Sequence, residues 1–256
     1  MSNNKPTRPF PIVGIGASAG GLAAFEEFFS GQPADGEPGM AFILVQHLAP
    51  DHDSILDQLV GRHTRMEVRE IEDGDVVRIN CAYVIPPGYD LTLDDGILHL
   101  QKPTRPRGQR LPIDSFFASL ARSHGSQAIA IILSGSGQDG SEGIRAIKAA
   151  GGLVLVQDPS TAEFDSMPQS AIETGLVDYQ LNPSEMPQQL LARAATGFGA
   201  TVQPEEASKD SSLQSILEML RTQTQHDFSQ YKPSTILRRL DRRAVRTHHA
   251  RLGVGE

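Results

Sequence analysis

The chain has 256 residues, a formal net charge of -8 at pH 7 and a single cysteine, Cys81. One cysteine excludes an internal disulfide and a zinc site built from several cysteines, and no close group of histidines and carboxylates suggests another metal or a cofactor. The acidic balance argues against nucleic acid as a partner. No stretch resembles a signal peptide or a membrane span, so we expect no membrane insertion and a cytoplasmic location.

Strand-like apolar runs alternate with helical patterns along the chain. The runs span residues 12–16, 41–45, 128–133 and 153–157. Helical patterns follow the first run at residues 22–29 and the third run at residues 141–150. This alternation is the signature of parallel crossover units. We therefore predict an α/β fold with a doubly wound, mainly parallel, Rossmann-like sheet.

The pattern changes between residues 67 and 101, where we predict an inserted β-hairpin region. Residues 76–85 and 91–100 have strand patterns, and the turn signals are Pro86-Pro87-Gly88 and Asp94-Asp95-Gly96. The second of these turns is typical of a hairpin. Cys81 lies inside the first strand pattern, so its predicted role is packing and not nucleophilic attack.

Ser18 lies on a glycine-rich turn between the first predicted strand and the first predicted helix. Together with Gly16 and Gly20 it fits the G-x-S-x-G elbow, in which small neighbours let the chain bend sharply and expose the hydroxyl. Amide groups at the start of the helix are then close enough to bind an oxyanion. Ser18 is therefore a candidate nucleophile, and its alternative role is that of a small turn residue.

The same turn also fits the loose form of a dinucleotide-binding fingerprint, through Gly14, Gly16 and Ala19. That function needs an acidic residue about 20 positions further on, at the end of the second strand. The second strand here ends in Gln46-His47. A histidine at this place favours a hydrolase, because a serine nucleophile needs a base to take its proton.

Ser18, His47 and Asp139 each follow the carboxyl end of a predicted parallel strand, where α/β proteins gather their chemistry. The aspartate would accept the other ring N–H of the histidine and fix its tautomer. Alternatives stay open: Asp139 would also serve as a helix cap, Asp158 follows another apolar strand, and His52 lies close to His47.

Several motifs, in order along the chain, resemble the CheB-type chemoreceptor methylesterase domain. This family hydrolyses glutamyl methyl esters on chemotaxis receptors, and often deamidates receptor glutamines, with a serine, a histidine and an aspartate. The resemblance implies these roles for Ser18, His47 and Asp139, with no cofactor. The motifs are Gly16-Ala17-Ser18-Ala19-Gly20-Gly21, Gln46-His47, Gly74, Tyr83-Val84-Ile85-Pro86-Pro87-Gly88 and Leu133-Ser134-Gly135-Ser136-Gly137-Gln138-Asp139-Gly140.

The chain departs from the family pattern at three places. Ala19 stands where the family usually has threonine, which keeps the backbone N–H and removes a hydroxyl. Ser136 precedes the aspartate in a loop of altered sequence and retains its backbone donor. The resemblance therefore implies that the amides of Ala19 and Ser136 support the oxyanion. The segment 109–114 keeps the family pattern only in part.

The end of the chain has a different character. Residues 213–256 contain two helical patterns, the second of them strongly basic, and resemble the start of the helical N-terminal domain of CheR-type receptor methyltransferases. The chain stops far short of a methyl-donor-binding domain, so we expect no methyltransferase activity. The predicted organisation is a polar tail at 1–11, a methylesterase domain at 12–196, a linker at 197–212 and the helical segment at 213–256.

The predicted function is a serine hydrolase whose partners are the methylated cytoplasmic helices of chemoreceptors. The arginines of the basic segment form either a solvated helix face or a surface that docks on acidic receptor helices. Two alternatives belong to other classes: a non-catalytic receptor-docking module, and a Rossmann-like nucleotide-binding protein.

Overall fold

The computed structural model describes residues 10–33, 35–46, 56–103 and 110–196. Seven parallel strands form one sheet in the order β3-β4-β2-β1-β7-β8-β9. The strands are β1 (Ile12–Ala17), β2 (Ala41–Gln46), β3 (Glu67–Glu70), β4 (Cys81–Val84), β7 (Ala128–Ile132), β8 (Leu153–Gln157) and β9 (Tyr179–Leu181). The α/β fold with a parallel sheet is confirmed.

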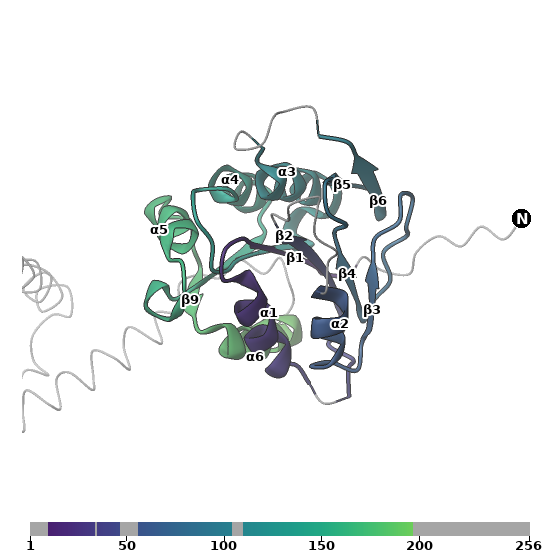
Figure 1. Ribbon diagram of the computed structural model, residues 1–256, viewed down its shortest axis with the longest axis horizontal. Helices are drawn as coiled ribbons and strands as arrows, with labels where there is room; N and C mark the ends of the chain where they lie inside the picture. Colours follow the sequence, from purple (N-terminus) through teal and green to yellow (C-terminus); the bar gives the residue numbers. More distant parts are fainter. Residues whose placement is uncertain (1–9, 34, 47–55, 104–109, 197–256) are drawn as a thin grey trace, which may run out of the picture. The chain divides into compact units, whose positions relative to one another are not determined.

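Helices cover both faces of the sheet, as Figure 1 shows. Every residue of β1, β2, β4, β7 and β8 is buried, which explains why the central strands have continuous apolar sequences. One face carries α1 (Gly21–Ser30), α2 (Leu56–Gly61) and α6 (Met186–Thr196), and the other carries α3 (Pro112–His124), α4 (Ser141–Ala149) and α5 (Ser166–Glu173).

The two glycines inside β1 let α3 approach the sheet closely. A Cβ built on Gly14 would lie 2.8 Å from the ring of Phe116, and one built on Gly16 would lie 2.5 Å from Ile113. On the opposite face of the same strand, Ile15 packs in the core under α1. The beginning of α3 is therefore fixed over the central strand of the sheet.

The predicted hairpin is present as β5 (Asp90–Asp94) and β6 (Ile97–Gln101). Its turn residues Asp95 and Gly96 have φ angles of 43° and 78°, the left-handed conformation that a two-residue hairpin turn requires.

The strand expected at residues 76–85 was wrong in extent. Only β4 forms a strand there, and it joins the main parallel sheet, whereas Val76 makes a single antiparallel bridge to Ile97. The edge strands β3 and β9 were not predicted. Both are short and partly exposed, so neither produces a long apolar run.

Two sequence expectations concern packing and membranes. Cys81 is buried at the start of β4, and this burial raises the pKa of its thiol, as expected for a packing residue. No helix in the described part of the chain has the length and apolarity needed to cross a membrane. The linker at 197–212 and the helical segment at 213–256 lie outside the described residues.

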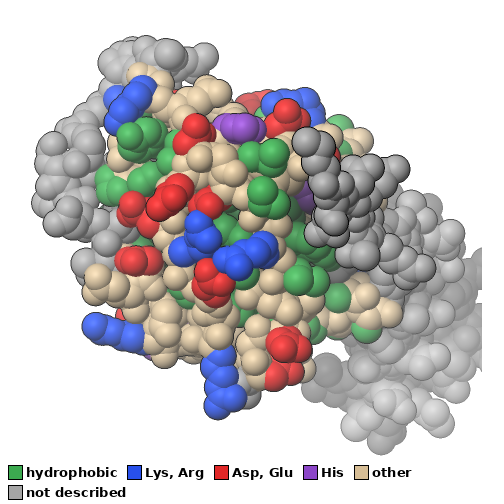
Figure 2. All heavy atoms as spheres, turned by 90° about the vertical axis from the view of Figure 1, so that its right-hand side faces the viewer, with side chains coloured by type: hydrophobic (Ala, Val, Ile, Leu, Met, Phe, Trp, Pro, Cys, Tyr) green, Lys and Arg blue, Asp and Glu red, His purple; other side chains and the backbone are tan. Residues whose placement is uncertain are grey.

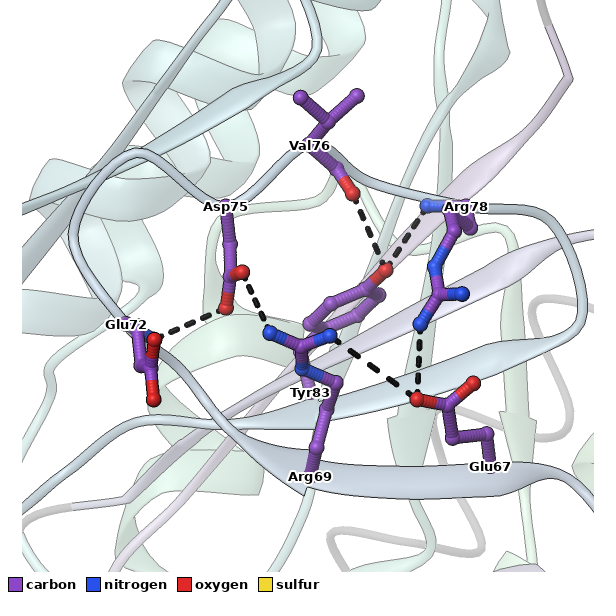
Figure 3. A network of polar contacts seen from close by, with 7 residues as sticks. All are labelled: Glu67, Arg69, Glu72, Asp75, Val76, Arg78 and Tyr83. Atoms are coloured by element: carbon purple, nitrogen blue, oxygen red, sulfur yellow. Dashed lines mark hydrogen bonds and ion pairs between the residues drawn. The ribbon is translucent and has the colours of Figure 1, made fainter.

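A network of charged and polar groups ties the edge of the sheet to the segment that precedes β4. The hydroxyl of Tyr83 accepts a hydrogen bond from the Arg78 N–H at 2.9 Å and donates one to the Val76 carbonyl at 3.3 Å (Figure 3). Beside it, Arg69 on β3 pairs with Asp75 at 2.5 Å. Figure 2 shows this face, where acidic and basic side chains lie interspersed.

Tyr83→Phe should lower the free energy of unfolding by about 1–3 kcal/mol, because the Arg78 N–H and the Val76 carbonyl lose their buried partner. Urea unfolding measures the loss. Tyr89→Phe is the matched control, since Lys102 lies over the Tyr89 ring at 3.7 Å and a phenylalanine keeps that contact. Equal stability of the two variants would contradict the role assigned to the Tyr83 hydroxyl.

Candidate functional site

The candidate site lies at the carboxyl end of the sheet, where the chain changes direction. From β1 the chain passes through α1 to β2 on one side, whereas from the neighbouring β7 it passes through α4 to β8 on the other side. Ligands of open α/β sheets bind at such a switch point. Ser18 follows β1 and Asp139 lies in the loop that follows β7, so two of the three predicted residues are at this point.

Ser18 is partly exposed and lies on the sharp turn between β1 and α1. Its N–H donates to the Ser134 carbonyl at 3.0 Å, and its own carbonyl accepts from Gly21 at 3.0 Å. The turn depends on Gly20, whose φ is 72° and whose added Cβ would lie 2.6 Å from the Ser134 hydroxyl oxygen. Among described residues other than glycine, only Asn80 and Asp95 have positive φ, so Ser18 is not itself strained.

The buried Ser134 joins three segments around Ser18. Its hydroxyl donates to the Ala19 carbonyl at 2.9 Å and accepts from the Phe164 N–H at 3.0 Å. Its backbone N–H donates to the Gln157 side chain at 2.8 Å. The turn after β1, the loop after β7 and the segment after β8 are therefore held together by one residue.

The backbone of Gly135 lies directly against the candidate nucleophile. A Cβ built there would be 3.1 Å from the Ser18 Cβ and would clash with the sulfur of Met167. The Gly135 N–H donates to the Phe164 carbonyl at 2.9 Å, so that amide is already engaged. Within the described part of the chain, no hydrogen bond engages the amide of Ala19 or that of the exposed Ser136.

Asp139 is buried, and its carboxylate lies at the start of α3. Its two oxygens accept hydrogen bonds from the Ile113 N–H at 3.0 Å and the Asp114 N–H at 2.9 Å. The first turn of a helix favours an anion at this place. The alternative that Asp139 caps the helix following it is wrong, because Gly140 is the N-cap residue of α4 and the Asp139 carboxylate binds amides of α3.

Asp114, in the first turn of α3, binds the start of α4 in a similar way. Its carboxylate accepts the Gly143 N–H at 2.7 Å in the first turn of α4. The pKa of the Asp114 carboxyl is raised to about 6, chiefly because burial disfavours its charged form; the Gly143 N–H opposes this shift and the Asp139 carboxylate reinforces it. The start of α3 thus binds the carboxylate of Asp139 in the loop before α4, and the start of α4 binds the carboxylate of Asp114 in α3.

The other described candidates for the acid and the base of the site have structural roles elsewhere. Asp158 accepts hydrogen bonds from the backbone and hydroxyl of Ser160, and the Ser160 hydroxyl lowers the pKa of its carboxyl, so it is a turn residue. Among the other described histidines, His63 contacts Ser30 at 3.1 Å, His99 lies in β6 and His124 ends α3.

The predicted base lies outside the described residues, as does its rival His52. The described chain leaves β2 at Gln46, the residue before His47, and Gln46 is in register with Ala17, the residue before Ser18. The side-chain amide of Gln46 also donates to the Ser18 carbonyl at 3.5 Å.

The first two glycines of the dinucleotide-binding fingerprint do not lie where a dinucleotide site needs them. Gly14 and Gly16 lie inside β1, where α3 covers them, and not on the turn that would approach a pyrophosphate. No group of three or more histidine, cysteine or carboxylate side chains in the described ranges is arranged to hold a metal ion.

Sequence reasoning missed the supporting residues Asp114, Ser134 and Gln157. Ser134 lies within a family motif, and Asp114 ends a segment that matches the family only in part, but neither position had been given a role. Their functions depend on contacts across 23 to 115 positions of sequence, so no local pattern reveals them.

Asp114→Asn should change how stability depends on pH. Because the pKa of Asp114 is raised from 3.8 to about 6, the folded state binds the proton more tightly, and the wild type loses stability as pH rises through this window. The variant lacks this titration, so its free energy of unfolding relative to wild type should increase from pH 4 to pH 6 and then level off. Urea unfolding at several pH values measures this, and a constant difference would contradict it.

Ser134→Ala should lower the free energy of unfolding by about 1–3 kcal/mol, because the Phe164 N–H and the Ala19 carbonyl lose a buried partner. Ser166→Ala, at an exposed position in the first turn of α5, is the control and should stay within about 0.5 kcal/mol of wild type. Urea unfolding compares them. If both variants are as stable as wild type, Ser134 does not hold the three segments together.

Comparisons with known proteins agree with the fold. The family model for CheB methylesterase matches residues 13–190, and the model for the CheR methyltransferase all-alpha domain matches residues 211–253. The crystal structure of the Thermotoga maritima CheB methylesterase catalytic domain superposes with a TM-score of 0.67 at 28% identity, covering 72% of this chain and 99% of that one.

Two longer proteins are also similar in sequence. An uncharacterized 104.1 kDa protein of Rhodobacter capsulatus is 37% identical over 213 residues, 72% of this chain and 22% of that protein. The protein-glutamate methylesterase/protein-glutamine glutaminase of Pyrococcus horikoshii is 34% identical over 189 residues, 72% of this chain and 51% of that protein. The chain thus spans about half or less of these two relatives. With a family model matching most of its length, the chain belongs to the CheB methylesterase family.

Proposed function

We propose that this chain is a serine hydrolase that removes methyl esters from glutamate side chains of chemotaxis receptors and deamidates receptor glutamines. Family membership supports the reaction class, and the Pyrococcus horikoshii relative carries both activities in its name. The single observation that carries the proposal is the meeting of Ser18 with the loop that bears Asp139 at the switch point of the sheet.

In the proposed mechanism, Ser18 attacks the ester carbonyl while His47 takes its proton, and methanol leaves with His47 acting as acid. Water then hydrolyses the acyl-enzyme and releases the glutamate. The place of His47 is supported by the strand register, because His47 and Ser18 each follow one member of the pair Gln46 and Ala17. Parallel strands in register bring the residues that follow them to the same edge of the sheet.

Asp139 has the role of fixing and stabilising the histidine. Hydrogen bonds from the Ile113 and Asp114 amides hold its carboxylate in one orientation, and the start of α3 favours its negative charge. A carboxylate held in this way accepts the ring N–H of His47, selects the tautomer that takes the serine proton, and stabilises the imidazolium that forms.

The oxyanion of the tetrahedral intermediate is assigned to the amides of Ala19 and Ser136. Ala19 follows the nucleophile directly, and Ser136 follows the glycine that packs on Ser18. Neither amide is engaged within the described part of the chain, whereas those of Gly135 and Gly21 are. Backbone donors left free beside a nucleophile are suited to a developing negative charge.

The proposed partners are the cytoplasmic helices of chemoreceptors, which places the reaction in the cytoplasm. The proposed organisation has a catalytic domain at residues 12–196, a linker at 197–212 and a helical segment at 213–256. The match of residues 211–253 to the CheR all-alpha domain supports the last of these. In this proposal the basic residues of the segment meet acidic receptor helices and speed encounter. They are Lys232, Arg238, Arg239, Arg242, Arg243 and Arg246.

Methanol release from a methyl-esterified receptor cytoplasmic fragment tests the proposal. Ser18→Ala should lower kcat by about 10³-fold or more, because no nucleophile remains, and Asp139→Asn should lower it by a smaller factor if His47 keeps its place. Thermal unfolding of both variants controls for loss of the fold.

Each result separates one of the alternatives. Full activity of Ser18→Ala would remove the nucleophile assignment. No turnover by the wild type, with fragment binding intact, would support a non-catalytic docking module. Stabilisation by a nucleotide would support the cofactor-binding alternative.

A further inference from the structure

Large apolar side chains are exposed at five places in the described part of the chain. They are Leu22 at 37%, Leu111 at 40%, Phe164 at 42%, Ile79 at 46% and Val76 at 63% of their full accessible area. Single exposed apolar residues are common on protein surfaces, but a group of them around one site marks an interaction surface. Three of the five border the candidate site, and we call Leu22, Leu111 and Phe164 the apolar rim.

Leu22 borders the site from one face of the sheet. It is the second residue of α1, and the residue before it, Gly21, donates its N–H to the Ser18 carbonyl at 3.0 Å. Leu111 borders the site from the opposite face, because it is the N-cap residue of α3, whose first turn binds Asp139. Figure 1 shows α1 and α3 on opposite faces of the sheet.

Phe164 borders the site along the sheet, from the direction of β8. Its N–H is bound by the Ser134 hydroxyl and its carbonyl accepts the Gly135 N–H, so its backbone is fixed to the loop that packs on Ser18. Because both backbone groups are engaged, the exposed side chain of Phe164 is held at this place. The rim residues thus lie on three segments that adjoin the site from different directions.

The charges beside Phe164 are negative. Phe164 lies between Glu163 and Asp165, both exposed. A Cβ built on Gly20 would lie 3.0 Å from the Glu163 carboxylate, which places this charge against the turn that carries Ser18. Carboxylates at this position repel a free glutamate side chain and tolerate a neutral methyl ester.

We propose that the apolar rim binds the apolar face of an amphipathic substrate helix on both sides of the glutamyl ester that Ser18 attacks. The inference rests on the proposed function and specifies how the substrate is held. On a helix, the residues three and four positions before and after the ester share its face, so apolar side chains there meet Leu22, Leu111 and Phe164 together. In this pose the carboxylates beside Phe164 do not repel the neutral ester, whereas they repel the glutamate product.

Binding of the methyl-esterified receptor fragment to a Ser18→Ala protein tests the rim without turnover. Adding Leu22→Ala and Phe164→Ala should weaken the measured Kd about tenfold, because the partner loses the apolar area that these two side chains cover. Alanine keeps α1 helical at position 22 and preserves the backbone bonds of residue 164. Circular dichroism and thermal unfolding establish that the variant is folded.

Val76→Ala with Ile79→Ala, introduced into the same Ser18→Ala protein, is the matched control. These two residues are at least as exposed as the rim, and in Figure 3 the side chain of Val76 points away from the polar network at the far edge of the sheet. The control should bind the fragment as tightly as its parent. An unchanged Kd in the rim variant, or an equal loss in the control, would overturn the proposal.

A kinetic measurement tests the rim in proteins that retain Ser18. The rim variant should lose about tenfold more kcat/KM on the receptor fragment than on p-nitrophenyl acetate, an ester too small to contact all three residues. An equal loss on both esters would contradict the rim as a docking surface. If the wild type releases no methanol, the proposed function fails, and the binding measurement still decides whether the rim holds the helix.

Discussion

The arrangement of the site depends on the first turn of α3, where the backbone amides of Ile113 and Asp114 bind the carboxylate of Asp139. A helix start offers unpaired N–H groups and a partial positive charge, so it holds a buried carboxylate that few other environments would stabilise. Asp114 then binds the start of α4 in return. The end of the loop after β7 and the start of α4 are consequently both bound to the first turn of α3.

Glycines allow α3, the turn after β1 and the loop after β7 to pack closely together. Gly14 and Gly16 allow α3 to lie directly on β1, and Gly20 and Gly135 allow the turn and the loop to meet at Ser134 and Ser18. A side chain at any of these four positions would meet atoms that are already packed. The sharp turn at the candidate nucleophile therefore depends on Gly20 and on close packing, and not on strain at the serine itself.

The same edge of the sheet carries both the proposed chemistry and the proposed recognition of substrate. Ser134 binds the backbone of Ala19 and of Phe164, so the residue that positions the elbow also positions part of the apolar rim. Coupling of this kind keeps the docking surface at a fixed distance from the reacting hydroxyl. A helical protein substrate needs such an arrangement, because its binding energy must place one side chain accurately.

The central strands, the elbow at Ser18 and the Asp95-Gly96 hairpin turn were predictable from sequence, because each depends on neighbouring residues: apolar runs, small residues around a serine, and left-handed turn chemistry. The edge strands escaped prediction because three or four partly exposed residues carry no periodic signal. Only the tertiary structure decided that Asp139 binds α3 and not the helix that follows it. That choice depends on which helix start folds against the loop, a contact spanning 26 positions that local sequence does not encode.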